Sequence, residues 1–260
     1  MGPLDGRRVA LTRPAESTDS LRRKLEGMGA LVLLTPAIRR APPTSWGPLD
    51  RGIAGVFSGR YAGVLFTSPA SVEPFWLRLR SAGGGNASLN GVVIGAVGQG
   101  TAAALGRLGI CVDVVPGAEY GSALAIAVGS FLGERIRGAR FLQPRAEEGR
   151  EELRGGLESR GAVVEVVAAY RTLRASPAEL EPLVANLRAG AVDAVVFASP
   201  SAVEAVLAAA SSGLGRARAV AIGETTAAAL EKAGIDDVWV ASRADDEGMA
   251  SAVVDALRTL

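Results

Sequence analysis

The chain has 260 residues, of which 48% are hydrophobic and 21% are charged, a composition typical of a folded globular protein with one large or two small domains. A formal net charge of +1 argues against nucleic-acid binding, and the absence of histidine with a single cysteine, Cys111, excludes His-based acid–base catalysis and His- or Cys-rich metal sites. We expect a cytoplasmic protein, because one cysteine cannot form an internal disulfide and because no membrane span or signal peptide is recognisable.

Short apolar runs alternate with longer amphipathic segments along the whole chain. The runs cover residues 8–12, 30–36, 63–68, 92–98, 111–116, 139–144, 162–170, 193–199, 219–223 and 237–241. Most of them are β-branched and almost continuously apolar, which is typical of strands buried on both faces of a parallel sheet. The segments between them, such as residues 17–29 with Leu21 and Leu25 at helical spacing, favour helices. The alternation predicts an α/β fold.

The second half of the chain repeats the first. The stretch VLFTSPASVEPF at residues 64–75 matches VVFASPSAVEAV at residues 195–206, and VGQGTAAALGRLGI at residues 97–110 matches IGETTAAALEKAGI at residues 222–235. In the same order, Arg13 matches Arg145 and Ser68 matches Ser199. Self-similarity of this length indicates a duplication. We therefore predict two similar domains, each a parallel five-stranded sheet flanked by helices.

Two repeat-related segments, near residues 36–43 and 168–176, are candidate linkers between these domains. If the chain crosses at both, the first domain consists of residues 1–37 with 173–260, and the second of residues 40–170. A simple cut near residue 130 is also compatible with the sequence.

The predicted strands end in small polar residues. In open parallel sheets, ligands bind beyond the carboxyl ends of the strands, where helix N-termini present free N–H groups. The candidate binding residues at these ends are Thr12, Arg13, Thr67, Ser68, Ser71, Gly98, Thr101, Arg145, Ser199, Ser201, Gly223, Thr225 and Thr226. The hydroxyl residues could instead be ordinary helix caps, and the arginines could be solvated surface residues. Their recurrence in both halves favours anion binding.

Tyr170 ends the apolar run at the second linker, just before the basic Arg171. It is either a half-buried packing residue or a functional phenol.

Seven motifs in a fixed order resemble those of the uroporphyrinogen-III synthase family over nearly the whole chain. They are LTRP, FTSPASV, VGQGTAAAL, FLQPRAEEGREEL, VVAAYRT, FASPSAV and IGETTAAALEKAGI. The resemblance implies two α/β domains joined by a two-stranded linker. It also implies a lyase of porphyrin and haem biosynthesis that cyclises the linear tetrapyrrole hydroxymethylbilane with loss of water and inversion of ring D. It further implies that no metal or organic cofactor is needed, that the protein is a monomer, and that hydroxymethylbilane synthase is the donor of the substrate.

The same resemblance assigns roles to particular residues. It places the family's functional tyrosine on Tyr170, whose phenol would give a proton to the leaving hydroxyl group. It places the family's threonines on Thr101 and Thr226, facing a cleft between the domains. The substrate's eight carboxylates suit helix N-termini and arginines. Two alternatives stay open, a catalytically silent two-lobed tetrapyrrole- or anion-binding regulatory module and a two-domain sugar-nucleotide transferase.

Overall fold

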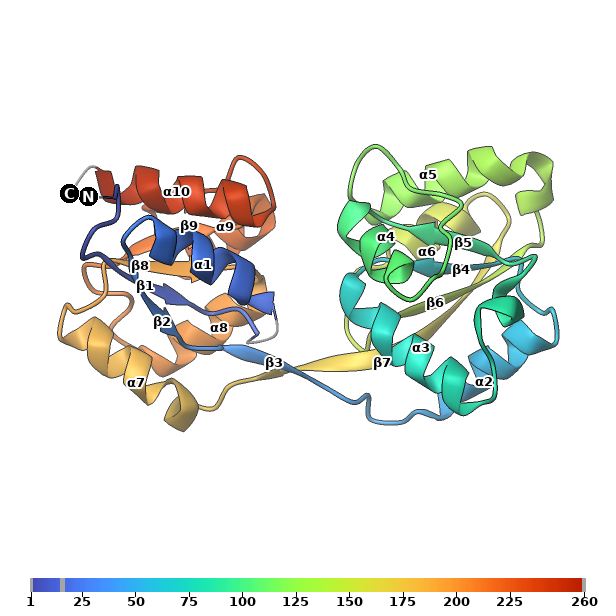
Figure 1. Cartoon of the computed structure of the whole chain (residues 1–260), viewed down its shortest axis with the longest axis horizontal. Helices are drawn as coiled ribbons and strands as arrows, with labels where there is room; N and C mark the ends of the chain where they lie inside the picture. Colours follow the sequence, from blue (N-terminus) through green and yellow to red (C-terminus); the bar gives the residue numbers. More distant parts are fainter. Residues whose placement is uncertain (1, 15–16, 259–260) are drawn as a thin grey trace. The chain divides into compact units, whose positions relative to one another are not determined.

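The computed structural model describes residues 2–14 and 17–258, and its residue contacts divide the chain into two compact units. Unit 1 consists of Met1–Arg40 with Leu173–Leu260, and unit 2 consists of Ala41–Thr172. Each unit is a sheet covered by helices on both faces (Figure 1).

Among the described residues, unit 1 is built on a five-stranded sheet in the order β10-β9-β8-β1-β2. Its strands are β1 (Arg8–Leu11), β2 (Leu31–Leu34), β8 (Ala194–Phe197), β9 (Arg218–Ala221) and β10 (Val238–Val240), and all neighbouring pairs are parallel. One face packs against α7 (Pro177–Arg188), α8 (Pro200–Ala209) and α9 (Glu224–Lys232), and the other against α1 (Asp19–Gly27) and α10 (Asp246–Arg258). The central strands are apolar on successive residues because both faces are covered.

Unit 2 has a sheet in the order β3-β7-β6-β4-β5, counted over the same described ranges. Its strands are β3 (Ile38–Ala41), β4 (Gly63–Phe66), β5 (Val93–Ala96), β6 (Arg140–Ala146) and β7 (Val163–Arg174). The pairs β4–β5, β4–β6 and β6–β7 are parallel. One face packs against α2 (Gly47–Phe57), α3 (Val72–Ser81) and α4 (Gln99–Gly106), and the other against α5 (Gly121–Leu132) and α6 (Glu152–Glu158). Short 3₁₀ turns, η2 (Pro69–Ser71), η3 (Asn86–Leu89) and η4 (Gly133–Ile136), join these elements.

Strands that the repeat equates take equivalent places in the two sheets. The order β9-β8-β1-β2 in unit 1 corresponds to β5-β4-β6-β7 in unit 2, strand for strand. The prediction of an α/β fold with two five-stranded, mainly parallel sheets flanked by helices is therefore confirmed.

One predicted strand is wrong. Residues 111–116 form only an isolated bridge, between Gly95 and Val114. The Asp113 carboxylate accepts the N–H of Ile94 at 2.8 Å, and the Asp113 N–H donates to the Ile94 carbonyl at 2.9 Å, so a side chain substitutes for part of the ladder. The fifth strand of unit 2 is instead β3, from the first predicted linker, which pairs with β7 from the second.

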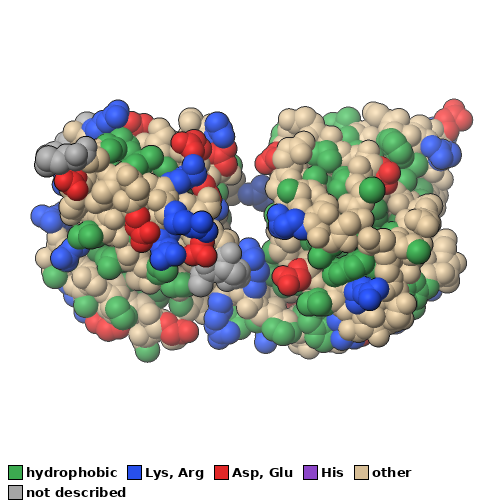
Figure 2. All heavy atoms as spheres, viewed as in Figure 1, with side chains coloured by type: hydrophobic (Ala, Val, Ile, Leu, Met, Phe, Trp, Pro, Cys, Tyr) green, Lys and Arg blue, Asp and Glu red, His purple; other side chains and the backbone are tan. Residues whose placement is uncertain are grey.

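The surface carries charges of both signs. On the face drawn in Figure 2, Lys and Arg side chains lie among Asp and Glu side chains, and neither sign forms an extended patch. This dispersion agrees with the net charge of +1. In the described part of the chain, no helix combines the length and the apolar character that crossing a membrane requires.

Candidate active site

The candidate residues gather at one edge of each sheet, because the carboxyl ends of parallel strands meet at the same edge. Along this edge in unit 2 lie, in sheet order, Tyr170 of β7, Arg145 of β6, Thr67 and Ser68 after β4, and Gly98 after β5. Along the corresponding edge in unit 1 lie Gly223 after β9, Ser199 after β8, and Thr12 and Arg13 after β1. The structure therefore brings the candidates together in two sets, one in each unit.

The serines act as caps. Ser199 is the N-cap of α8, and its Oγ accepts the N–H of Ala202 at 3.3 Å. Ser68 accepts the N–H of Ala70 at 3.2 Å, while the fully buried Ser71 donates its hydroxyl to the Ser68 carbonyl at 2.9 Å. Ser201 is half-buried in the first turn of α8. Ser68 and Ser199 are therefore helix caps in this structure. The other N–H groups of each first turn are the donors that could bind an anion.

Three of the five candidate threonines are buried, and the other two are not. Thr12 is fully buried, and its Oγ1 donates to the Val196 carbonyl at 2.8 Å, which ties β1 to β8. Thr101 in α4 is 2% exposed and Thr226 in α9 is 3% exposed. Thr67 is half-buried after β4, and Thr225 is exposed in α9. The structure thus gives Thr12 a role in joining strands, and it places Thr101 and Thr226 under the first turns of their helices.

Arg13 and Arg145 are largely buried and already paired. Arg13 donates to Asp246 at the start of α10, and its side chain is 16% exposed. Arg145 donates to the Arg150 carbonyl at 3.0 Å and to Glu151, and its side chain is 12% exposed. These arginines are not solvated surface residues. Each holds a carboxylate of the chain itself at the carboxyl edge of its sheet.

A third internal carboxylate lies at the N-terminus of α4. Glu119 Oε1 accepts the N–H of Gln99 at 3.0 Å. A Cβ atom at Gly98 would lie 2.3 Å from the same oxygen, so only glycine leaves the carboxylate in place there. At the repeat-related Gly223 a Cβ atom would meet no heavy atom of the described residues within 4 Å. The two equivalent helix N-termini therefore differ, since α4 is closed by Glu119 and α9 is open at this point.

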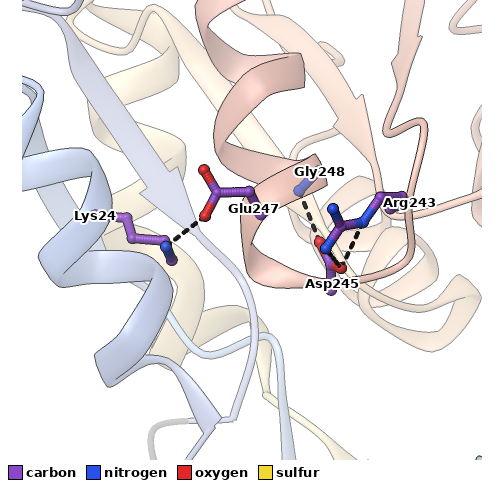
Figure 3. Close-up of polar contacts among 5 residues, drawn as sticks. All are labelled: Lys24, Arg243, Asp245, Glu247 and Gly248. Carbon is purple, nitrogen blue, oxygen red and sulfur yellow. Dashed lines mark hydrogen bonds and ion pairs between the residues drawn. The ribbon is translucent and has the colours of Figure 1, made fainter.

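The start of α10 carries three consecutive acidic residues, each with its own donor. Asp245 accepts the N–H of Gly248 at 2.8 Å and pairs with Arg243, while Glu247 pairs with Lys24 of α1 (Figure 3). The N–H of Gly248, and next the Arg243 guanidinium, hold the pKa of Asp245 below its usual value. The hydrogen bond to Glu247 raises the pKa of Lys24. Together with Asp246, which pairs with Arg13, these contacts fix the loop after β10 against β1 and α1.

Tyr170 lies at a β-bulge. In the pairing of β6 with β7, Arg145 opposes Ala168 and Ala146 opposes Tyr170, so Ala169 is the extra residue. Ala169 is fully buried in the core beneath α2, α3 and α4, and Tyr170 packs against the same core although the two are neighbours in the chain. Bulges redirect side chains in this way, often beside functional sites. The half-buried phenol of Tyr170 is thereby turned onto the α2–α4 face at the carboxyl edge of the sheet.

Tyr61 shows why a perturbed pKa alone does not select the functional tyrosine. Tyr61 is 3% exposed and donates its hydroxyl to Glu165 Oε2 at 2.5 Å. Burial, and then the Glu165 carboxylate, raise the pKa of Tyr61 to about 12. Tyr61 precedes β4 and Glu165 is near the start of β7, so this pair lies at the amino ends of the strands. Its position marks it as structural.

Sequence reasoning missed the three acidic partners. Glu119, Asp246 and Glu151 lie 20, 233 and 6 positions from their donors in the chain. The first two contacts are made by tertiary structure and leave no local motif. Glu151, which lies close in sequence to Arg145, is the one that local spacing could have indicated.

Comparisons with known proteins agree with this arrangement. The sequence profile of a family described as "Uroporphyrinogen-III synthase HemD" matches residues 19–251. The chain is similar to the uroporphyrinogen-III synthase of Synechococcus elongatus, with 31% identity over 77% of this chain and 74% of that protein. It is also similar to the uroporphyrinogen-III synthase of Chlorobaculum parvum, with 27% identity over 96% of this chain and 99% of that protein.

Solved structures show the same fold. A mutant uroporphyrinogen III synthase of Thermus thermophilus aligns with a TM-score of 0.65 and 21% identity, covering 98% of this chain and all (100%) of that chain. The uroporphyrinogen-III synthetase of Helicobacter pylori aligns with a TM-score of 0.58 and 16% identity, covering 96% of this chain and 99% of that chain. The family profile spans most of both units, and with the sequence relatives it shows that the chain belongs to the uroporphyrinogen-III synthase family, the cyclizing hydroxymethylbilane hydrolyases.

Proposed function

We propose that this protein carries out its family's reaction, the closure of hydroxymethylbilane to uroporphyrinogen III, and that the phenol of Tyr170 supplies the proton that leaves with the hydroxyl group. The observation that carries the activity is the family profile, which matches residues 19–251. The observation that supports the role of Tyr170 is the bulge that turns its side chain at the carboxyl edge of the unit 2 sheet.

The chemistry asks for a proton donor and for control of geometry. Loss of hydroxide from the hydroxymethyl carbon needs a proton at the leaving oxygen, and a phenol that keeps its proton at neutral pH can donate it directly or through a water molecule. The azafulvene cation that remains is stabilised in part by the substrate's own carboxylates. Ring D must then be attacked at its substituted carbon, which depends on how the chain of four rings is held.

Backbone N–H groups are the main candidate ligands for the substrate's carboxylates. The first turns of α8 and α9 follow Ser199 and Gly223 at the carboxyl edge of unit 1, and the helix dipole favours an anion at each. Arg13 and Arg145 add positive charge at the two edges, although each now holds an internal carboxylate. Binding by backbone groups also fits the burial of Thr101 and Thr226, whose side chains are only 2% and 3% exposed.

A coupled assay tests the activity. Hydroxymethylbilane is generated in place by hydroxymethylbilane synthase, which we propose as the natural donor, and the type I and type III products are separated. We expect the type III isomer. Type I product alone, at the spontaneous rate, would refute the activity, and binding of a tetrapyrrole without turnover would indicate the silent binding module instead.

The role of Tyr170 is tested in the same assay. We expect Tyr170→Phe to lower turnover at least about tenfold, within the range for a positioned acid. Tyr61→Phe is the matched control, because Tyr61 precedes β4 and lies with Glu165 at the amino ends of the strands, at the opposite edge of the sheet. Unchanged turnover in Tyr170→Phe would remove the phenol from the mechanism and leave the activity in place.

We further propose that the protein works as a monomer in the cytoplasm. Light scattering should then give a mass near 26.5 kDa for the purified chain. A mass of twice that value at working concentration would contradict the monomer.

A further inference from the structure

Arg171, the residue after Tyr170, has a buried donor with no acceptor. Its Nε is buried and makes no hydrogen bond, and its guanidinium forms no ion pair with any residue that the structure describes. Buried polar groups in native proteins are nearly always hydrogen-bonded, and an exception calls for an explanation such as a missing ion or ligand. Arg171 differs in this from Arg13, which holds Asp246 at the corresponding edge of unit 1.

Arg145, on the neighbouring strand, shares the feature. Its two terminal nitrogens donate to the Arg150 carbonyl and to Glu151, but its Nε is also buried without an acceptor. Two adjacent strands therefore each carry, where β6 ends beside β7, an arginine whose Nε has no acceptor among the described residues.

The register places these two arginines on one face of the sheet. Phe141 of β6 lies in the core beneath α5 and α6, and Arg145 follows it by an even number of residues, so both point to that face. Ala146 opposes Tyr170, and both belong to the other face. Arg171 follows Tyr170 and so returns to the face of Arg145.

The geometry of the guanidinium group suits a carboxylate ligand. Arginine binds a carboxylate with two parallel N–H···O bonds, and the side of the group formed by Nε and one terminal nitrogen is a suitable fork. Resting on the proposed function, we infer that Arg171 is a further substrate-binding residue, whose guanidinium takes one carboxylate of hydroxymethylbilane beside Tyr170, where β6 ends against β7. A substrate with eight carboxylates around four rings can reach both faces of the sheet at this carboxyl edge, where β6 ends.

The test compares Arg171→Gln and Arg171→Lys with wild type in the coupled assay. We expect Arg171→Gln to raise KM at least about tenfold, the effect of losing a charge-assisted hydrogen bond. Arg171→Lys keeps the positive charge but not the two-pronged geometry of the guanidinium, so its KM should lie between those of wild type and Arg171→Gln. The thermal midpoint of Arg171→Gln should not fall, because the buried Nε donates to no residue that the structure describes.

Arg174→Gln is the matched control. Arg174 lies on the same strand, is 59% exposed, and pairs with Glu204. The KM of Arg174→Gln should therefore equal that of wild type. Unchanged KM in Arg171→Gln, or a loss of folding in that variant, would overturn the inference while the activity stands. If wild type itself produced only the type I isomer, the proposed function would fail instead.

Discussion

Gly98 and Gly223 are equivalent residues of the repeat with different surroundings. The extended backbone at both positions, with φ of −166° and 176°, is open to any residue, so steric contact alone separates them. At Gly98 the contact is the Glu119 carboxylate, and at Gly223 no described atom is close. The internal anion is therefore a property of α4 and not of the repeated motif.

This difference predicts opposite behaviour of two alanine variants. Gly98→Ala should expel the Glu119 carboxylate from α4 and lower the free energy of unfolding by about 1 kcal/mol more than Gly223→Ala does, the usual cost of a lost helix cap. Urea denaturation measures both, and Gly223→Ala accounts for the intrinsic effect of alanine at an N-cap.

A double variant completes that test. Glu119→Ala should remove the same contact. The double variant Gly98→Ala/Glu119→Ala should therefore lose no more unfolding free energy than the sum of the loss in Glu119→Ala and the loss in Gly223→Ala. Fully additive losses would mean that Gly98 does not act through Glu119.

Tyr61 gives a prediction at alkaline pH. Its pKa of about 12 in the folded protein lies above the ordinary value near ~10, so the native state keeps a proton that the unfolded chain releases. That contribution is fully present below pH ~10 and is lost as pH rises toward ~12. Tyr61→Phe should be less stable than wild type at pH 8, because it lacks the hydrogen bond to Glu165. It should also lose less stability between pH 8 and 11.

The measurement is a series of denaturation midpoints across this range. Tyr120→Phe, which removes an exposed phenol, should reproduce the wild-type slope. An identical slope in Tyr61→Phe would show that the buried phenol does not couple to folding.

At the scale of elements, the apolar runs predicted the strands well where strands are buried. Every run except residues 111–116 contains a strand. The signal is strongest for β4 and β8, in which all residues are buried, because burial on both faces leaves a continuous apolar run. The β3 strand gave no such signal, because Arg39 and Arg40 are exposed and the strand lies at the edge of its sheet. The 111–116 run failed because Asp113 uses its side chain in place of a backbone acceptor.

The site was predictable in position but not in contacts. Strand ends and helix starts follow from the alternation, and they place Ser199, Gly223 and Arg145 at the expected edges. The direction of each side chain depends on partners elsewhere. The bulge before Tyr170 and the pairing of Arg13 with Asp246 are set by register and by tertiary packing, which no short motif encodes.

Helix α10 offers a prediction at acid pH. Asp245 accepts the N–H of Gly248, and its pKa is held below the ordinary value, so it stabilises the fold above the unfolded-state pKa near 3.8 and this support is lost as pH falls through the folded-state pKa. Asp245→Asn should have a lower thermal midpoint than wild type at pH 7. Its midpoint should then fall less than that of wild type when the pH is lowered to 3. Asp255→Asn, in the last turn and paired only with Arg258 among the described residues, should do neither. Equal acid sensitivity of wild type and Asp245→Asn would contradict this.

At the scale of the molecule, the duplication explains why the two sheets are alike. It does not say at which residues the chain passes from one domain to the other. Both sheets contain four repeat-related strands in one order, yet unit 1 takes its strands from both ends of the chain. We propose that the domains follow this division, with β3 and β7 as the connecting strands, and not a cut near residue 130.

The last prediction separates those two divisions. A fragment of residues 38–174 contains β3, β4, β5, β6 and β7 with α2 to α6, which is the complete sheet of unit 2 and the helices of both its faces. A fragment of residues 1–130 contains β1 and β2 without β8 and β9, and β4 and β5 without β6 and β7, so it leaves both cores half-built. Because a core that lacks its central strands exposes the apolar surface that stabilises it, we expect a single cooperative thermal transition for residues 38–174, followed by circular dichroism, and none for residues 1–130. A cooperative transition in residues 1–130 together with its absence in residues 38–174 would reverse the assignment and favour the cut near residue 130.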